Sequence, residues 1–301
     1  MPVKFKLLLA TVFWGATPTI GRVLAEYQAP FVPVFGRFLF AGIILSLFCM
    51  VQKAWQPIPR DLWVRFLILG LFGICLHNGL LFKALEDTTA TNASVLIGLI
   101  APQVVILDLL LHRAIPKLAV MGGVLLGFIG AAVVVTDGDW NALKTLTFGP
   151  GETLVFLSGL AWAIYTVVIR HVFEQLPTLW ATTVATWVGV GFLFPFLFEQ
   201  PTVSVAIFTD LTALGLMLFL GFIGSALGFL WYNEAVIELG TVGAALYVNL
   251  VPLCGILWAA VLLGENLTLS VFLGGGLVLV GLMLVNPPQW KRLSFTRASD
   301  P

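Results

Sequence analysis

Charged residues are scarce in this sequence of 301 residues. They make up 10% of the chain, whereas a soluble domain carries about a quarter. Apolar residues make up 59%, and the mean hydropathy is +1.03. This composition excludes a soluble globular fold. Neither sign of charge is in excess, because 15 Lys and Arg residues balance 15 Asp and Glu residues, and we therefore expect no nucleic-acid partner.

Cysteine and histidine are also rare. Cys49, Cys75 and Cys254 all lie within apolar stretches, where they are expected to be small buried hydrophobes rather than disulfide partners. The three histidines are far apart in the sequence and show no metal-ligand spacing. The sequence also lacks a Gly-rich nucleotide-binding loop that ends in Lys. We predict no catalytic residues, no metal and no cofactor.

Apolar runs dominate what is present. A membrane-spanning helix needs roughly 20 apolar residues with few charges. Lys4 and Lys6 precede the first run as in a secretory signal, but no small-residue cleavage site follows, so we expect this run to be the first span. The sequence predicts an all-α polytopic membrane protein with ten transmembrane helices, at residues 7–21, 38–52 (longer if Arg37 is included), 66–82, 88–107, 118–136, 153–169, 175–199, 211–233, 239–264 and 266–290.

Basic residues favour cytoplasmic loops and so predict the orientation of the spans. With the N-terminus inside, the outer side receives only Arg22, Lys83 and Lys144, and Arg37 lies within a span. We predict that both termini are cytoplasmic and that the chain resides in a plasma membrane, of the bacterial inner-membrane type. The inner side receives the other eleven basic residues: Lys4, Lys6, Lys53, Arg60, Arg65, Arg113, Lys117, Arg170, Lys291, Arg292 and Arg297.

The two halves of the sequence resemble each other. Trp14 and Arg22 match Trp162 and Arg170 at an offset of 148 residues. The offset is 150 for Pro102 and Pro252, and 151 for Gly123 and Gly130 with Gly274 and Gly281. Each half holds five predicted spans, an odd number, so the second half enters the bilayer from the opposite face. We predict two inverted five-helix repeats, typical of many transporters, with a bundle stabilised by simple duplication as the alternative.

Turn-forming residues mark the boundary between the halves. Asp137, Gly138, Gly149 and Pro150 all fall in one short segment that indicates a loop. We predict a first repeat at residues 1–140, an outer connecting loop at 141–150, a second repeat at 151–290 and a cytoplasmic tail at 291–301.

Short motifs stand in the first, second, sixth and ninth spans. They are Phe13-Trp14-Gly15, Arg37-Phe38, Ala161-Trp162-Ala163, and Pro252 followed by Leu263-Gly264-Glu265. From about residue 7 to 286, the chain thereby resembles the EamA-type transporters of the drug/metabolite transporter superfamily. This resemblance implies a ten-helix fold and the export or exchange of small metabolites, amino acids prominent among them. The first half departs from the pattern at His112-Arg113-Ala114, and no arginine of the second half matches Arg37.

Polar and aromatic side chains at membrane depth are candidates for a transport path, because they are costly in lipid unless paired or hydrated. Each also has a structural explanation, as a packing residue or an interhelical hydrogen bond. Arg37 is a candidate gate or carboxylate clamp, with a fixed partner such as Glu26 as the alternative, and Pro102 and Pro252 are candidate flexing points or static bends. The predicted substrate-binding residues are Trp14, Thr17, His77, Asn78, Gln103, Trp162, Tyr165, Tyr247 and Asn249.

These residues favour a secondary transporter of small organic metabolites, above all amino acids or related amphipathic solutes. Alternating access around a central cavity at the bilayer midplane is the expected mechanism. A membrane-embedded enzyme acting on lipid-linked substrates and a non-transporting sensor or scaffold are the alternatives. The expected partners are a small solute and the lipid bilayer. A monomer is expected to be functional, with a dimer as the alternative.

Overall fold

The computed structural model describes residues 1–88, 93, 96–112, 117–139, 141, 149–263 and 268–285. Most of the connecting loop at 141–150 and the whole tail at 291–301 lie outside these ranges. The described residues form helices and connecting turns, and they confirm the predicted all-α membrane fold.

Ten helical segments among the described residues match the ten predicted spans. Three of them are short apolar segments, at Ile100–Leu111, Thr241–Gly255 and Leu269–Val285. The other seven are long and apolar enough to cross a membrane: Val3–Ala25, Phe31–Gln52, Arg60–Asp87, Leu118–Val135, Pro150–Phe173, Thr178–Phe198 and Leu211–Leu239.

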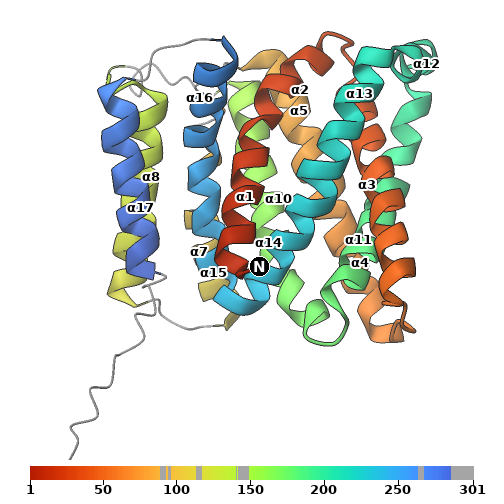
Figure 1. Cartoon of the computed structure of the whole chain (residues 1–301), viewed down its shortest axis with the longest axis horizontal. Coiled ribbons are helices and arrows are strands. Elements are labelled where there is room, and N and C mark those ends of the chain that lie inside the picture. Colours follow the sequence, from red (N-terminus) through yellow and green to blue (C-terminus); the bar gives the residue numbers. More distant parts are fainter. Residues whose placement is uncertain are drawn as a thin grey trace, which may run out of the picture.

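The helices fall into two sets of five spans that run in opposite directions. In Figure 1, α1 begins and α17 ends at the lower end of the bundle, whereas α10 begins at the upper end. The first set comprises α1 (Val3–Gly15) with α2 (Thr17–Ala25), α3 (Phe31–Gln52), η1 (Arg60–Leu62) with α4 (Trp63–Ile68), η2 (Leu69–Leu76) and α5 (His77–Asp87), α7 (Ile100–His112), and α8 (Leu118–Val135). The second comprises α10 (Pro150–Phe173), α11 (Thr178–Leu193) with η3 (Phe194–Phe198), α13 (Leu211–Phe219) with η4 (Leu220–Leu227) and α14 (Gly228–Leu239), α15 (Thr241–Ala245) with η5 (Leu246–Asn249) and α16 (Leu250–Leu263), and α17 (Leu269–Val285).

Several predicted span limits need correction. The second span begins at Phe31 rather than at residue 38, so Arg37 lies inside it. In the fourth span, α7 begins only at Ile100, and residues 89–92 and 94–95 lie outside the described part. The loop after the seventh span contains a short helix, α12 (Pro201–Thr209), that the sequence pattern did not predict.

Pro102 and Pro252 lie in the first turn of a helix, and their part as flexing points or static bends stays a prediction. Each proline is the third residue of its helix, α7 or α16. The backbone N–H groups of a first turn have no partner within the helix, so a proline there removes no hydrogen bond. The interruption lies before the proline, as the 3-10 turn η5 before α16 illustrates.

Two π-helical segments occur at equivalent places in the repeats. η2 and η4 are both π-helices of eight residues, and they are offset by 151 residues. Each contacts the second span of the other repeat through a glycine. A Cβ on Gly70 would lie 2.7 Å from the Gly189 N atom of α11, and a Cβ on Gly221 would lie 2.7 Å from the Arg37 carbonyl oxygen of α3. The third span of each repeat thus packs against the other repeat, and small residues permit the close approach.

The last spans of the two repeats, α8 and α17, lie side by side at one edge of the molecule (Figure 1). Glycines make the contact. A Cβ on Gly123 would lie only 2.7 Å from the Gly281 carbonyl oxygen, and a Cβ on Gly130 only 2.5 Å from the Gly274 carbonyl oxygen. These are the glycines that match at an offset of 151, paired crosswise as an inverted repeat requires.

Candidate functional site

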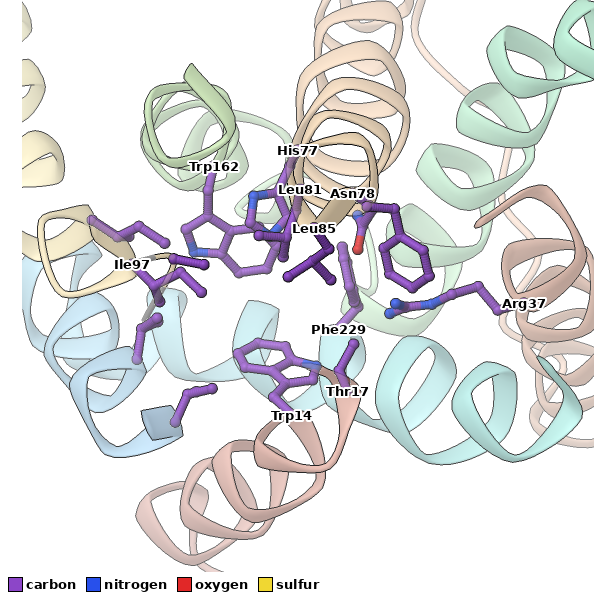
Figure 2. A pocket seen from close by; sticks show the side chains of 15 residues that line it. Trp14, Thr17, Arg37, His77, Asn78, Leu81, Leu85, Ile97, Trp162 and Phe229 are labelled. Atoms are coloured by element: carbon purple, nitrogen blue, oxygen red, sulfur yellow. The ribbon is translucent and has the colours of Figure 1, made fainter. Parts of the chain in front are cut away.

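A cavity of about 80 Å³ lies between the two repeats. Side chains from both repeats line it, and Figure 2 shows those from α1, α3, α5, α10 and α14 pointing toward one another. Six residues singled out in the sequence meet here: Trp14, Thr17, Arg37, His77, Asn78 and Trp162. The rest of the described lining is apolar: Leu81, Phe82, Leu85, Ala93, Ile97, Ile100, Phe229, Val248 and Val251.

Trp14 owes its position to a break in one helix and to the π-helix of another. It is the penultimate residue of α1, which ends before Thr17 and Pro18 begin α2. Its indole Nε1 donates a hydrogen bond of 2.8 Å to the carbonyl oxygen of Gly224 in η4. A π-helix has i→i+5 hydrogen bonds in place of the i→i+4 bonds of an α-helix. Where the pattern changes, a carbonyl group can lose its helical partner and accept a hydrogen bond from a side chain.

Asn78 makes the corresponding contact in the first repeat. Its Nδ2 donates hydrogen bonds to the carbonyl oxygens of Gly73 (3.0 Å) and Ile74 (3.1 Å) in η2. Gly73 is the counterpart of Gly224 at the offset of 151. With its Nδ2 held in this way, the Asn78 amide oxygen points into the cavity (Figure 2).

His77 is fixed by Ser158 of α10. The Ser158 hydroxyl donates to the His77 carbonyl oxygen (2.7 Å), and His77 Nδ1 lies 3.0 Å from both the Ser158 carbonyl and hydroxyl oxygens. A proton on Nδ1 satisfies the carbonyl oxygen, which leaves Nε2 as an acceptor. The imidazole ring lies 4.6 Å from the Trp162 ring, centroid to centroid.

A cluster of aromatic rings closes the cavity on the side where α1 begins. Trp14 meets Trp162 edge to face with centroids 5.4 Å apart, and both rings contact Phe229 and Tyr232. The Tyr232 hydroxyl lies 2.8 Å from the hydroxyl of Thr166 and accepts a hydrogen bond of 3.2 Å from Trp162 Nε1. We call Trp14, Trp162, Phe229 and Tyr232 the aromatic floor.

Tyr165 lies behind the aromatic floor rather than in the cavity lining. Its hydroxyl donates to Asn233 Oδ1 (2.9 Å), and Asn233 Nδ2 donates to Thr182 Oγ1 (2.9 Å). This buried chain of hydrogen bonds joins α10, α14 and α11. In the structure Tyr165 therefore holds helices together and does not face the cavity.

Arg37 is almost completely buried, with 2% of its surface exposed, and its guanidinium group faces the cavity (Figure 2). Its Nε donates to the hydroxyl of Ser225 in η4 (2.9 Å), and its Cζ lies 4.9 Å from the centre of the Phe38 ring. The partner of Arg37 is thus Ser225, not Glu26. Arg37 Nη1 makes no hydrogen bond within the described structure.

The whole chain matches one protein family. The EamA-like transporter family covers residues 3–136 and 149–286, one match for each repeat. The chain belongs to this family. The assignment indicates a membrane transporter rather than an enzyme.

Relatives and a solved structure agree with the EamA assignment. The chain is 28% identical over 284 residues to the uncharacterized transporter YyaM of Bacillus subtilis, covering 93% of this chain and 92% of the relative. It is 28% identical over 291 residues to an uncharacterized transporter of Archaeoglobus fulgidus, with coverage of 96% and 99%. One solved crystal structure superposes with a TM-score of 0.73 at 16% identity, covering 94% of this chain and 96% of the other, which shows the same fold.

Three other predicted site residues of this EamA chain do not line the cavity. Gln103 Nε2 donates to the Phe156 carbonyl oxygen (3.2 Å) and so connects α7 to α10. Asn249 is fully buried beside Gly127, and neither of its side-chain polar atoms has a partner in the described structure. Tyr247 is buried in η5.

Phe229, Tyr232, Asn233 and Ser225 were missed in the sequence. One signal was available, since Phe229 stands at the offset of 151 from Asn78. The others lie in an apolar run whose local sequence does not reveal which face it presents to the cavity. No three His, Cys, Asp or Glu side chains within the described ranges lie close enough to hold a metal ion.

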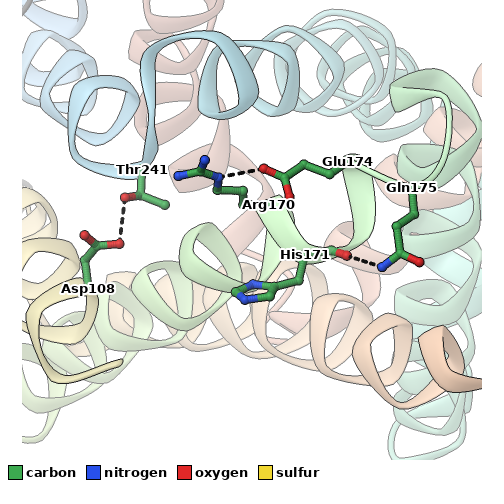
Figure 3. A network of polar contacts seen from close by, with 6 residues as sticks. All are labelled: Asp108, Arg170, His171, Glu174, Gln175 and Thr241. Carbon is green, nitrogen blue, oxygen red and sulfur yellow. Dashed lines mark hydrogen bonds and ion pairs between the residues drawn. The ribbon is translucent and has the colours of Figure 1, made fainter. Parts of the chain in front are cut away.

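Polar contacts also join the repeats on the side where α1 begins. Lys6 of α1 forms an ion pair of 2.6 Å with Glu234 of α14. Thr241 at the start of α15 donates a hydrogen bond of 2.9 Å to Asp108 of α7 (Figure 3). Asp108 thus bonds to the second repeat. At the end of α10 the contacts are local: Arg170 with Glu174, and Gln175 with the His171 carbonyl oxygen.

Tyr27 and Asp210 join the repeats on the opposite side. The Tyr27 hydroxyl donates to one carboxylate oxygen of Asp210, and the other accepts from the backbone N atoms of Thr212 (2.7 Å) and Ala213 (3.4 Å) at the start of α13. The hydrogen bond from Tyr27, followed by those from the backbone, lowers the pKa of Asp210. The same hydrogen bond, together with desolvation, raises the pKa of Tyr27.

Proposed function

We propose that this EamA transporter exports or exchanges small organic metabolites, above all amino acids or related amphipathic solutes, as a secondary transporter. The observation that carries the proposal is the cavity at the interface of two inverted repeats, with the matched residues Trp14 and Trp162 on its wall. Flat aromatic faces accommodate apolar side chains, while a few hydrogen-bonding groups orient the polar end of a solute.

Alternating access is the mechanism that this arrangement supports best. The cavity extends past Leu81 to Leu85, toward the end of α5, while the aromatic floor separates it from the side where α1 begins. A rocking motion of one repeat against the other would open the floor and close the opposite side. The Lys6–Glu234 and Tyr27–Asp210 contacts lie on the two sides where such a motion must break contacts.

We place the protein in the bacterial plasma (inner) membrane with both termini in the cytoplasm and propose that a monomer suffices. The distribution of basic residues supports this orientation. In that orientation the cavity of this conformation is directed toward the outside. Both repeats of the chain contribute side chains to the cavity, and we propose on this basis that a monomer can bind the solute.

The proposed function is tested in liposomes that contain only this protein. Vesicles loaded with unlabelled L-leucine, L-phenylalanine or L-threonine are mixed with the labelled amino acid, and we expect saturable counterflow for at least one of them. Trp14→Phe, His77→Gln and Trp162→Phe should each lower that flux about tenfold, because each removes an interaction of about 1–1.5 kcal/mol at the cavity wall.

Trp63→Phe is the matched control, because Trp63 is 46% exposed and far from the cavity lining. It should leave the flux unchanged. Equal amounts of folded protein in every sample are verified by size-exclusion chromatography. Absence of counterflow for all three amino acids, or unchanged flux in all three cavity variants, would contradict the proposal.

A further inference from the structure

We infer that the cavity recognises solutes through a single carboxylate bound at Arg37, with the apolar body of the solute lying against Trp14, Trp162 and Ile97. This inference rests on the proposed transport function and names the substrate class of the same cavity. The carboxylate site is assembled by three groups, Arg37, Thr17 and Gly224, from the first, second and eighth spans.

The first observation is an incomplete set of hydrogen bonds around a buried charge. A guanidinium group has five N–H donors and needs acceptors when it leaves water. Ser225 takes the donor of Nε, and the ring of Phe38 lies beneath Cζ, but Nη1 has no partner in the described structure. A purely structural arginine would direct these donors at backbone carbonyls. Here the unpaired donor belongs to a cavity-lining group.

The second observation is that a further unpartnered polar atom lies beside the same guanidinium group, on the side of Nη2. Thr17 Oγ1 is buried and makes no hydrogen bond in the described structure. A Cβ on Gly224 would lie 3.9 Å from Arg37 Nη2, from Thr17 Oγ1 and from Trp14 Cδ1. The missing side chain of Gly224 therefore leaves a space surrounded by two hydrogen-bond donors, and a carboxylate is an acceptor that suits both of them.

The charge of the lining selects an anion. Arg37 is the only side chain with a fixed charge among the described residues that line the cavity, and none of those residues is Asp or Glu. An anionic solute supplies the missing counter-charge. A cationic solute would be repelled by Arg37 with no carboxylate to compensate.

The other end of the cavity is apolar. In Figure 2, Arg37, Asn78 and Thr17 lie at one end, whereas Trp162 and Ile97 lie at the other. Ile100, Val248 and Val251 are further apolar residues of the lining. An amphipathic solute fits this polarity in one orientation only, with its carboxylate at Arg37 and its apolar body toward Ile97.

One guanidinium group in an apolar cavity also limits the charge of the solute. A phosphate monoester carries about −1.5 to −2 charges near neutral pH, and one arginine would leave part of this charge uncompensated. A carboxylate carries one charge. A branched aliphatic acid or an amino acid with an apolar side chain has one carboxylate and an apolar body, as this lining requires.

The test uses four probes with one isobutyl skeleton: 3-methylbutanoate, L-leucine, 3-methylbutanol and 3-methylbutylammonium. Binding to the purified full-length chain in detergent is measured by calorimetry and by thermal stabilisation near neutral pH. We expect 3-methylbutanoate and L-leucine to bind with a Kd at least tenfold lower than the alcohol and the ammonium compound, because only the first two carry a carboxylate.

Arg37→Gln should raise the Kd of the two carboxylate probes at least tenfold and abolish discrimination against the alcohol. Arg170→Gln is the matched control, because Arg170 is exposed and pairs with Glu174 away from the cavity. It should leave all four Kd values unchanged. Gly224→Ala should raise the Kd of the carboxylate probes several-fold, since its methyl group occupies the space beside Arg37 while meeting only ordinary contacts of 3.9 Å.

The inference is overturned if the alcohol or the ammonium probe binds as tightly as 3-methylbutanoate, if none of the four probes binds, or if folded Arg37→Gln protein retains carboxylate selectivity. Should Arg37→Gln fail to fold, the probe comparison on the wild-type chain and the Gly224→Ala variant decide the question. Carboxylate-selective binding without any counterflow in liposomes would contradict the proposed function alone. Counterflow that is equally fast for solutes with and without a carboxylate would contradict this inference alone.

Discussion

At the residue scale, hydrogen bonds to backbone carbonyl groups hold two of the cavity side chains in place. Trp14 and Asn78 each occupy a carbonyl group freed by a π-helix, at Gly224 and Gly73 respectively. Both polar residues stand out in the sequence because they are rare at membrane depth. Their acceptors do not, because a π-helix in an apolar run has no reliable sequence signature. Likewise, the sequence exposes Arg37 as a candidate but not Ser225, which lies 188 residues further along the chain.

The Tyr27–Asp210 hydrogen bond provides a pH-dependent prediction at this scale. The pKa of Asp210 is lower in the folded than in the unfolded chain, so the bond contributes stability above about pH 4 and loses it as the pH falls through the lowered value. The difference in thermal midpoint between wild type and Tyr27→Phe should therefore be present near neutral pH and shrink under more acidic conditions. It should also fade above about pH 10, as the raised pKa of Tyr27 is passed.

Thermal unfolding in one detergent across this pH range measures the effect. The control is Tyr27→Phe introduced into Asp210→Asn protein, where no lowered carboxyl pKa exists and the pH-dependent difference should vanish. A difference that grows on acidification would contradict the assignment of this bond.

At the scale of elements, apolar periodicity and spacing predicted the spans well, but not their internal breaks. Uninterrupted apolar runs predicted the fifth and tenth spans, because nothing in α8 or α17 departs from a regular helix. The third, seventh, eighth and ninth spans change helix type within the run, and the first is interrupted at Ala16. The π-helices η2 and η4 pack against the other repeat. The prolines occupy matched positions near the start of α7 and α16, but the sequence does not show that a helix restarts just before each of them.

The contact between α8 and α17 gives a prediction about stability. Gly130→Ala should lower the stability by about 1–3 kcal/mol, because its Cβ would lie 2.5 Å from the Gly274 carbonyl oxygen and the backbones must move apart. Gly122→Ala in the same helix is the control, because a Cβ there meets no atom within 4 Å, and it should change the stability by no more than about 0.5 kcal/mol. The measurement is thermal unfolding in detergent, and equal effects of both substitutions would refute the proposed close approach.

At the scale of the whole molecule, the duplication was the most informative feature of the sequence. Matched pairs such as Trp14 with Trp162 and Gly123 with Gly274 predicted inverted repeats, and the structure places these glycines in crosswise contacts. The central cavity followed from that symmetry. Its lining was predicted only in part, because Gln103 and Tyr165 form hydrogen bonds between helices, and Tyr247 and Asn249 are buried outside the lining.

The central claim is that the cavity between the repeats is reached alternately from both faces of the membrane. It is tested most directly with Ile97→Cys in a chain that also carries Cys49→Ala, Cys75→Ala and Cys254→Ala, because Ile97 lines the cavity and the three native cysteines are buried. Oriented proteoliposomes are treated with a membrane-impermeant maleimide on one face or the other. Our account predicts that the introduced thiol is modified from either face and that transported solute slows the reaction, whereas modification from one face alone under every condition would contradict it.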